Sequence, residues 1–118
     1  MLPKQSRLSK EKDIVLVLRR GRRLTSSFMN LNVLNNHTKV SRFGFIVSKK
    51  VAAKPIKRNL IKRRMRNIIG KHKKNLLTGF DCLFVTKPPI KLVDYQDTEK
   101  ELLGLLERAG QVKKKPGS

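Results

Sequence analysis

The chain has 118 residues and a formal net charge of +21, from 29 lysines and arginines against 8 aspartates and glutamates. This length suits one domain with one modest core, and periodic apolar blocks within the 38% of hydrophobic residues argue against disorder. No apolar run reaches the ~20 residues that span a bilayer, and the N-terminus lacks the apolar region of a signal peptide. The single cysteine, Cys82, cannot form an internal disulfide or a zinc site alone. We therefore expect a cytoplasmic protein without a membrane partner.

The first predicted element is a helix that Ser9 caps. Glu11 and Asp13 suit the positive N-terminal end of its dipole. Gly21 is expected to end the helix in a left-handed conformation. Arg19 and Arg20 suit the negative C-terminal end of the helix, and the basic stretch 19–23 is interpreted as the loop at its exit.

Alternation of apolar and polar residues predicts strands at 28–34 and 42–48, separated by a turn at 35–38. A third strand is predicted at 80–85. Residues 51–54 could extend the sheet or end it, and the pattern does not decide. The residues expected to face the core from the first two strands are Met29, Leu31, Val33, Phe43, Phe45 and Val47.

Two further helices are predicted. Pro55 suits the first turn of one, and Gly70 suits its C-terminal end. Asp94 is expected to cap the other. Their core-facing residues are predicted to be Ile61, Met65, Ile68 and Ile69, and Tyr95, Leu102, Leu105, Leu106 and Ala109.

Together these elements follow the order α-β-β-(β)-α-β-α, which indicates an α+β fold with a small mixed sheet packed with helices. We expect a single RNA-binding domain over residues 1–118. Its folded core should cover about 7–109, and the tail 110–118 is predicted to be disordered.

The central part of the chain lacks negative charge. Residues 14–80 contain eighteen lysines and arginines and no aspartate or glutamate, so the neutralising charge must come from outside the protein. Arg58, Lys62 and Arg66 recur every four residues, ~6 Å apart along a helix. This spacing suits contacts with a phosphate backbone. Asn59 and Arg63 widen the row, while Lys49, Lys50, Lys57 and Arg64 add charge beside it.

No catalytic residue is assigned to the polypeptide. The aspartates and glutamates gather mainly at the beginnings of two helices, where dipole compensation explains them. His37 and His72 are interpreted as solvated surface residues and Cys82 as a small core residue. We therefore predict no catalytic residue and no metal site in the protein itself.

An ordered set of motifs resembles the protein subunit of bacterial ribonuclease P over nearly the whole chain. The motifs are Arg7-Leu8-Ser9-Lys10-x-x-Asp13, Arg20-Gly21-Arg22, Phe43-Gly44-Phe45-Ile46-Val47-Ser48-Lys49-Lys50-Val51, Lys57-Arg58-Asn59, Ile61-Lys62-Arg63-x-x-Arg66, Asp81 with its apolar strand, Lys87-Pro88, and Tyr95 with the leucine-rich helix that follows it.

This resemblance implies a left-handed β-α-β crossover through the basic helix. It also implies a holoenzyme in which a catalytic RNA binds Mg²⁺ and removes the 5′ leader of precursor tRNA. The protein would bind the catalytic RNA and the leader, raise substrate affinity and support cleavage at low Mg²⁺. No obligate protein partner is expected. The residues that would contact the catalytic RNA are Lys49, Lys50, Lys57, Arg58, Asn59, Lys62, Arg63, Arg64 and Arg66.

The resemblance places the leader in a cleft between the first helix and the exposed sheet face, at Ile14, Leu18 and Asn32. Aromatic residues are usual in the family at these positions, and aliphatic contacts should stabilise a base less than the ~1–3 kcal/mol of stacking. Leu60 stands where the family has an arginine. Arg64 lies one turn later on the same side of the helix, and we expect it to replace part of the missing charge.

Two other classes of protein share the charge and the size. A structural RNA-binding protein of the ribosomal type is one alternative, and the ordered motifs favour the ribonuclease P subunit over it. A cationic protein that binds DNA or a membrane surface is the other. The basic helix carries charge on too many faces to lie on a membrane and lacks aromatic anchors.

Overall fold

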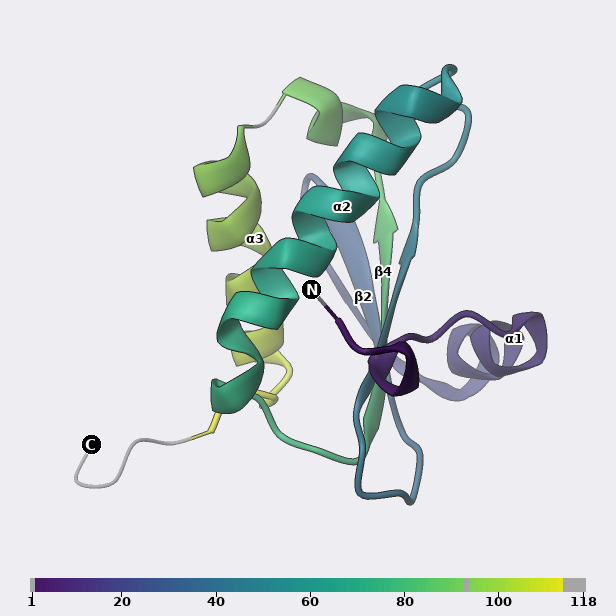
Figure 1. The fold of residues 1–118 in the computed structure, drawn as a ribbon, viewed down its shortest axis with the longest axis vertical. Coiled ribbons are helices and arrows are strands. Elements are labelled where there is room, and N and C mark those ends of the chain that lie inside the picture. The colour runs from purple at the N-terminus through teal and green to yellow at the C-terminus, as the bar shows by residue number, and fades with distance from the viewer. Residues whose placement is uncertain (1, 93, 114–118) are drawn as a thin grey trace.

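A four-stranded β-sheet separates one helix from two others in the computed structural model, which describes residues 2–92 and 94–113 (Figure 1). The elements, in chain order, are the 3-10 helix η1 (Lys4–Ser6), α1 (Glu11–Arg20), β1 (Arg22–Thr25), β2 (Met29–Asn35), β3 (Arg42–Ile46), α2 (Pro55–His72), η2 (Lys73–Asn75), β4 (Phe80–Thr86), η3 (Pro88–Leu92) and α3 (Tyr95–Arg108). The predicted α+β class is confirmed.

The sheet has the strand order β1-β2-β4-β3. β2 pairs antiparallel with β1 and with β4, whereas β3 and β4 are parallel neighbours. Parallel strands need a long connection across a face of the sheet, and α2 supplies it. The basic helix therefore lies in a β-α-β unit, as predicted, and the left-handed sense of this crossover stays a prediction of the resemblance.

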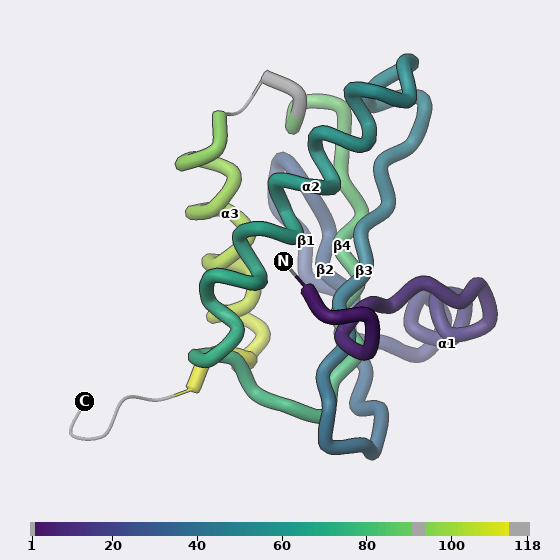
Figure 2. Tube along the Cα trace, viewed as in Figure 1, coloured from purple at the N-terminus to yellow at the C-terminus, as the bar shows by residue number. Residues whose placement is uncertain are grey.

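Helices α2 and α3 cover one face of the sheet, and α1 lies on the other (Figures 1 and 2). Met29, Leu31 and Val33 alternate along β2 and are buried in the larger core, as predicted. The predicted apolar stripe of α2 packs into the same core, together with the leucines of α3.

The smaller core lies beneath α1. Leu8, Val17 and Leu83 are buried there. Arg42 fastens the helix to the sheet, because its Nη1 donates to Asp13 of α1 at 3.0 Å, while its Nε and Nη2 donate to Asp81 of β4 at 2.9 and 2.6 Å. The hydrogen bonds to Asp81 are the main cause that raises the pKa of Arg42, against the opposing effect of burial.

Several predicted boundaries are wrong. Lys10, not Ser9, precedes the first helical residue, and no side chain caps that helix end. Gly21 has φ −71°, so it is not left-handed. A Cβ there would lie 2.5 Å from the Val17 carbonyl oxygen, and close packing is therefore the reason for glycine. Gly70 does not end α2, which continues to His72.

Arg19 and Arg20 end α1, as predicted, whereas Arg22 and Arg23 do not form a loop, because residues 22–25 form strand β1. Residues 51–54, left open by the pattern, form no strand and belong to the turn before α2. β3 ends at Ile46, two residues earlier than predicted, and β4 extends to Thr86, one residue later than predicted. The cap at Asp94 is confirmed, since its carboxylate accepts from the Asp97 N–H at 2.8 Å.

The folded core is longer than the predicted 7–109. Leu2 and Ser6 are buried at the N-terminal end. Beyond α3, Gln111 is buried and Val112 pairs with Leu76 in an isolated bridge. The predicted disorder of residues 110–113 is therefore wrong, and residues 114–118 lie outside the described part of the chain.

Candidate nucleic-acid interface

One flank of α2 faces a groove beside the edge strand β3. Because the apolar stripe of this helix packs on the sheet, residues four apart next to the stripe line up along one flank. Lys62 and Arg66 occupy that flank. They line a groove of about 220 Å³ together with Arg7, Leu8, Ser9, Ile14, Phe43, Gly44 and Phe45.

The groove combines positive charge with an aromatic ring. Arg7, Lys62 and Arg66 supply three cations, and none of the described residues that line the groove is acidic. Phe45 is half-buried and stacks on Phe84, with ring centroids 5.6 Å apart and planes at 10°. Cationic side chains that can follow a phosphate backbone, beside a half-buried aromatic ring, suit the binding of single-stranded nucleic acid.

Arg7 and Phe45 were not among the predicted interface residues. Alternation assigns Phe45 to the core face, and the structure places it there. It also lines the groove because β3 is an edge strand of the sheet. Arg7 reaches the groove through a parallel bridge to Phe43. Its only sequence signal is its place in the opening motif of the resemblance.

The turn between β3 and α2 carries the predicted Lys49 and Lys50, and both are exposed. Arg58 holds this turn in place, because its Nη1 donates to the carbonyl oxygens of Ala52 at 3.0 Å and Ala53 at 2.7 Å. Arg58 therefore supports the turn in addition to any contact with RNA.

The opposite flank of α2 faces α3. The Tyr95 hydroxyl donates to Asn67 at 3.4 Å, and Lys71 forms an ion pair with Glu99 at 3.3 Å. Helical spacing places Leu60 and Arg64 on this flank, so Arg64 is not brought together with Lys62 and Arg66. The predicted residues exposed on α2 between or beyond these flanks are Lys57, Asn59 and Arg63.

The three predicted leader residues differ in exposure. Ile14 is half-buried and lines the groove, and Leu18 is 37% exposed. Asn32 is only 1% exposed, and its Oδ1 accepts from Arg23 Nε at 3.3 Å. Asn32 is therefore buried, its part in leader binding stays a prediction, and the exposed residue beside it is Arg23.

Part of the sheet face on the α1 side is only half covered. Asn30 of β2 and Ile46 of β3 both pair with Val85 of β4, so the three residues form one row across the sheet. All three are half-buried. This row is the part of the sheet face that a bound strand could reach beside α1.

The remaining reactive side chains have structural surroundings. Burial raises the pKa of Cys82 to about 12, so its thiol is protonated, and its prediction as a core residue is confirmed. His72 is half-buried and is therefore only partly solvated, and its Nε2 lies 3.0 Å from the Glu99 carboxylate. Across residues 2–92 and 94–113, no three His, Cys, Asp or Glu side chains gather to hold a metal ion. No helix in the same ranges could cross a membrane.

The sequence profile of the family described as Ribonuclease P matches residues 2–110. The chain belongs to the ribonuclease P protein family. A ribonuclease P protein component of Clostridium botulinum (strain Alaska E43 / Type E3) is 33% identical over 111 residues, which covers 88% of each chain. One of Syntrophomonas wolfei is 29% identical and covers 93% of this chain and 92% of its own.

Solved structures of ribonuclease P proteins share the fold. The RNase P protein of Staphylococcus aureus superposes with a TM-score of 0.86 at 25% identity, covering 93% of this chain and 100% of that one. The protein of Thermotoga maritima gives 0.79 at 28% identity, covering 86% and 96%. Membership of the ribonuclease P family makes this chain the protein component of an endoribonuclease that has an RNA subunit.

Proposed function

We propose that this chain binds the catalytic RNA of ribonuclease P and the 5′ leader of precursor tRNA in the cytoplasm, and thereby supports removal of the leader. The observation that carries the proposal is the groove lined by Arg7, Lys62, Arg66 and Phe45. Lys62, Arg66 and Phe45 belong to residues 14–80, a stretch that has eighteen basic residues and no acidic one. A polyanion is the natural partner to supply the counter-charge for such a surface.

The two subunits divide the chemistry. The proposal assigns hydrolysis of the phosphodiester bond to the RNA subunit, which also holds most of the Mg²⁺. The protein contributes binding free energy and charge neutralisation. Lysines and arginines that replace condensed counterions reduce the Mg²⁺ needed to hold the RNA and the substrate together.

Two parts of the protein surface bind the two RNAs. Lys49, Lys50 and the exposed basic residues of α2 face the catalytic RNA. The leader lies near Ile14 and Leu18 of α1, where the half-covered sheet row and Arg23 are also accessible. Aliphatic side chains and a guanidinium here take the place of the aromatic residues usual in the family.

Cleavage of a 5′-extended precursor tRNA tests this function. The reaction is run under multiple turnover at low Mg²⁺ with a bacterial ribonuclease P RNA, with and without the protein. We expect the protein alone to be inert and the combination to cleave at the mature 5′ end faster than RNA alone. Tight binding without faster cleavage, repeated with RNA from the same source as the protein, would reject the proposal.

The salt dependence of binding tests the electrostatic part. Engagement of about 6–10 phosphates gives a log–log slope of several units. Lys62→Ala should weaken binding to many RNA sequences and lower this slope by about one. Lys100→Ala, an exposed lysine on α3, is the matched control. A loss for Lys62→Ala confined to one RNA sequence would instead mean that Lys62 contacts a base.

A further inference from the structure

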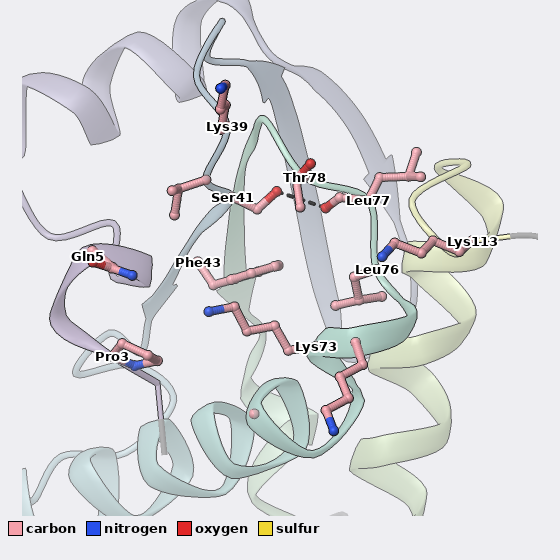
Figure 3. Close-up of a pocket in the computed structure, with 13 residues that line it drawn as sticks. Pro3, Gln5, Lys39, Ser41, Phe43, Lys73, Leu76, Leu77, Thr78 and Lys113 are labelled. Carbon is pink, nitrogen blue, oxygen red and sulfur yellow. Dashed lines mark hydrogen bonds between the residues drawn. The ribbon is translucent and has the colours of Figure 1, made fainter.

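A second pocket lies at the C-terminal end of α2, beyond the groove (Figure 3). Its volume is about 540 Å³. Lysines reach it from three separate segments: Lys39 from the turn between β2 and β3, Lys73 and Lys74 from η2, and Lys113 from the segment after α3. Within the part of the chain that the structure describes, no acidic residue lines it.

The floor of the pocket is apolar. Phe43 and Leu76 form part of it, and each belongs to the main core at 3% exposed. Ser41 also lines the pocket, but its hydroxyl donates to the Leu77 carbonyl at 2.8 Å and accepts from the Phe80 N–H at 3.1 Å. The pocket therefore combines an apolar floor with lysines around its opening.

Backbone hydrogen bonds hold this wall in place. The Leu77 N–H donates to Gln111 at 2.8 Å, and the Lys113 N–H donates to Asn75 at 2.7 Å. These bonds join the segment after α2 to the segment after α3. The backbone that carries these lysines is thus fixed around one opening, although like charges repel each other at close range. Of the four lysines, Lys73 donates its Nζ to Ser6 Oγ at 2.6 Å.

The pocket continues the basic flank of α2. Lys62, Arg66, Gly70 and Lys74 follow each other at intervals of four residues, the first two in the groove and the last two in the pocket. Phe43 lines both. Gly70 has no side chain, so α2 places only backbone at the position where the pocket begins.

We propose that this pocket binds one nucleotide of single-stranded RNA, with its phosphate among the lysines and its base against the apolar floor. The inference rests on the proposed function and extends it by a second contact beyond the groove. Lysine ammonium groups bind phosphates as point charges, without reading sequence. The apolar floor favours a nucleotide over inorganic phosphate, which has no apolar part to bury.

Three variants of the full chain distinguish the binding of a nucleotide inside the pocket from the effect of the protein's net charge on RNA affinity. Gly70→Met fills the pocket and leaves every charge in place, and Thr78→Leu fills it from the loop after η2. A triple variant, Lys39→Gln with Lys74→Gln and Lys113→Gln, removes three exposed charges. The matched control, Lys10→Gln with Lys12→Gln and Lys100→Gln, removes three exposed lysines elsewhere.

The readouts are affinity for ribonuclease P RNA, and affinity of the assembled holoenzyme for precursor tRNA with and without its leader. Loss of the phosphate contacts should weaken binding by about tenfold in the triple variant. Loss of the contact between the base and the floor should weaken binding by about tenfold in Gly70→Met or Thr78→Leu, provided that the variant retains the wild-type circular dichroism spectrum. The control triple should lose less. A defect in RNA affinity places the nucleotide in the catalytic RNA, whereas a defect only with a leader places it in the substrate.

Two results would overturn the inference. Equal losses for the pocket triple and the control triple would mean that only net charge matters. Wild-type affinity in folded Gly70→Met and Thr78→Leu would mean that no nucleotide enters. Failure of the wild-type chain to stimulate cleavage would instead reject the proposed function, so the two failures are distinguishable.

Discussion

Arg42 is the residue whose replacement should most clearly loosen α1 from the sheet. Its side chain is 30% exposed and pairs with the side chain of Asp81, which is only 5% exposed, and with that of Asp13, which is 26% exposed. Arg42→Met keeps most of the volume and leaves the Asp81 carboxylate with the Asn36 amide at 2.9 Å. Breaking a fully buried pair costs about 3–5 kcal/mol, and the partial exposure of Arg42 reduces this to about 2–3 kcal/mol.

Thermal and urea unfolding at constant salt measure the effect. A loss of about 2–3 kcal/mol lowers the Tm of a domain of this size by roughly 6–15 °C. Asp13→Asn is the control, because Asp13 is 26% exposed against 5% for Asp81, and a more exposed pair contributes about 0.2–1 kcal/mol. If Arg42→Met costs no more than Asp13→Asn, the buried pair with Asp81 does not stabilise the fold, and the reasoning fails.

Three further predictions concern single side chains. Cys82, buried with its pKa raised to about 12, should not react with a thiol reagent at pH 8 until the protein is unfolded, and rapid native labelling would contradict its burial. Arg64→Ala should weaken binding to catalytic RNA as Arg63→Ala does; unchanged affinity for Arg64→Ala alone would show that Arg64 does not replace the charge missing at Leu60. The hydrogen bond with His72 lowers the pKa of Glu99, so its stabilisation is present above the unfolded pKa and lost as pH falls through the lower folded pKa. Urea unfolding should therefore show that Glu99→Gln is less stable than the wild type at neutral pH. This difference in the free energy of unfolding should disappear below about pH 4.5. A difference that stays constant with pH would exclude the Glu99–His72 pair as the cause.

The regular elements with a buried face could be predicted from the sequence. Met29, Leu31 and Val33 alternate because one face of β2 is buried, and the stripe of α2 has a helical period for the same reason. The cap at Asp94 depends on neighbours three residues away. In each case the determining interactions are local or repeat with a fixed period.

The elements that were missed depend on contacts between distant segments. β1 has mainly exposed polar residues and exists because it pairs with β2. Gly21 is fixed by its closeness to Val17 and to the Val33 carbonyl, which no local rule describes. Phe45 lines the groove because β3 is an edge strand, and that depends on the order of strands in the sheet.

The edges of the sheet bear on how the protein behaves before it meets RNA. An exposed edge strand can recruit the same strand of another copy and begin aggregation. Here β1 is only four residues long and carries Arg22 and Arg23. On the other edge, the Leu8 N–H donates to the Phe43 carbonyl at 2.9 Å, so the chain's own N-terminal segment occupies part of β3. The arginines on β1 therefore have a second consequence: until a polyanion covers them, like charges keep two copies from joining edge to edge.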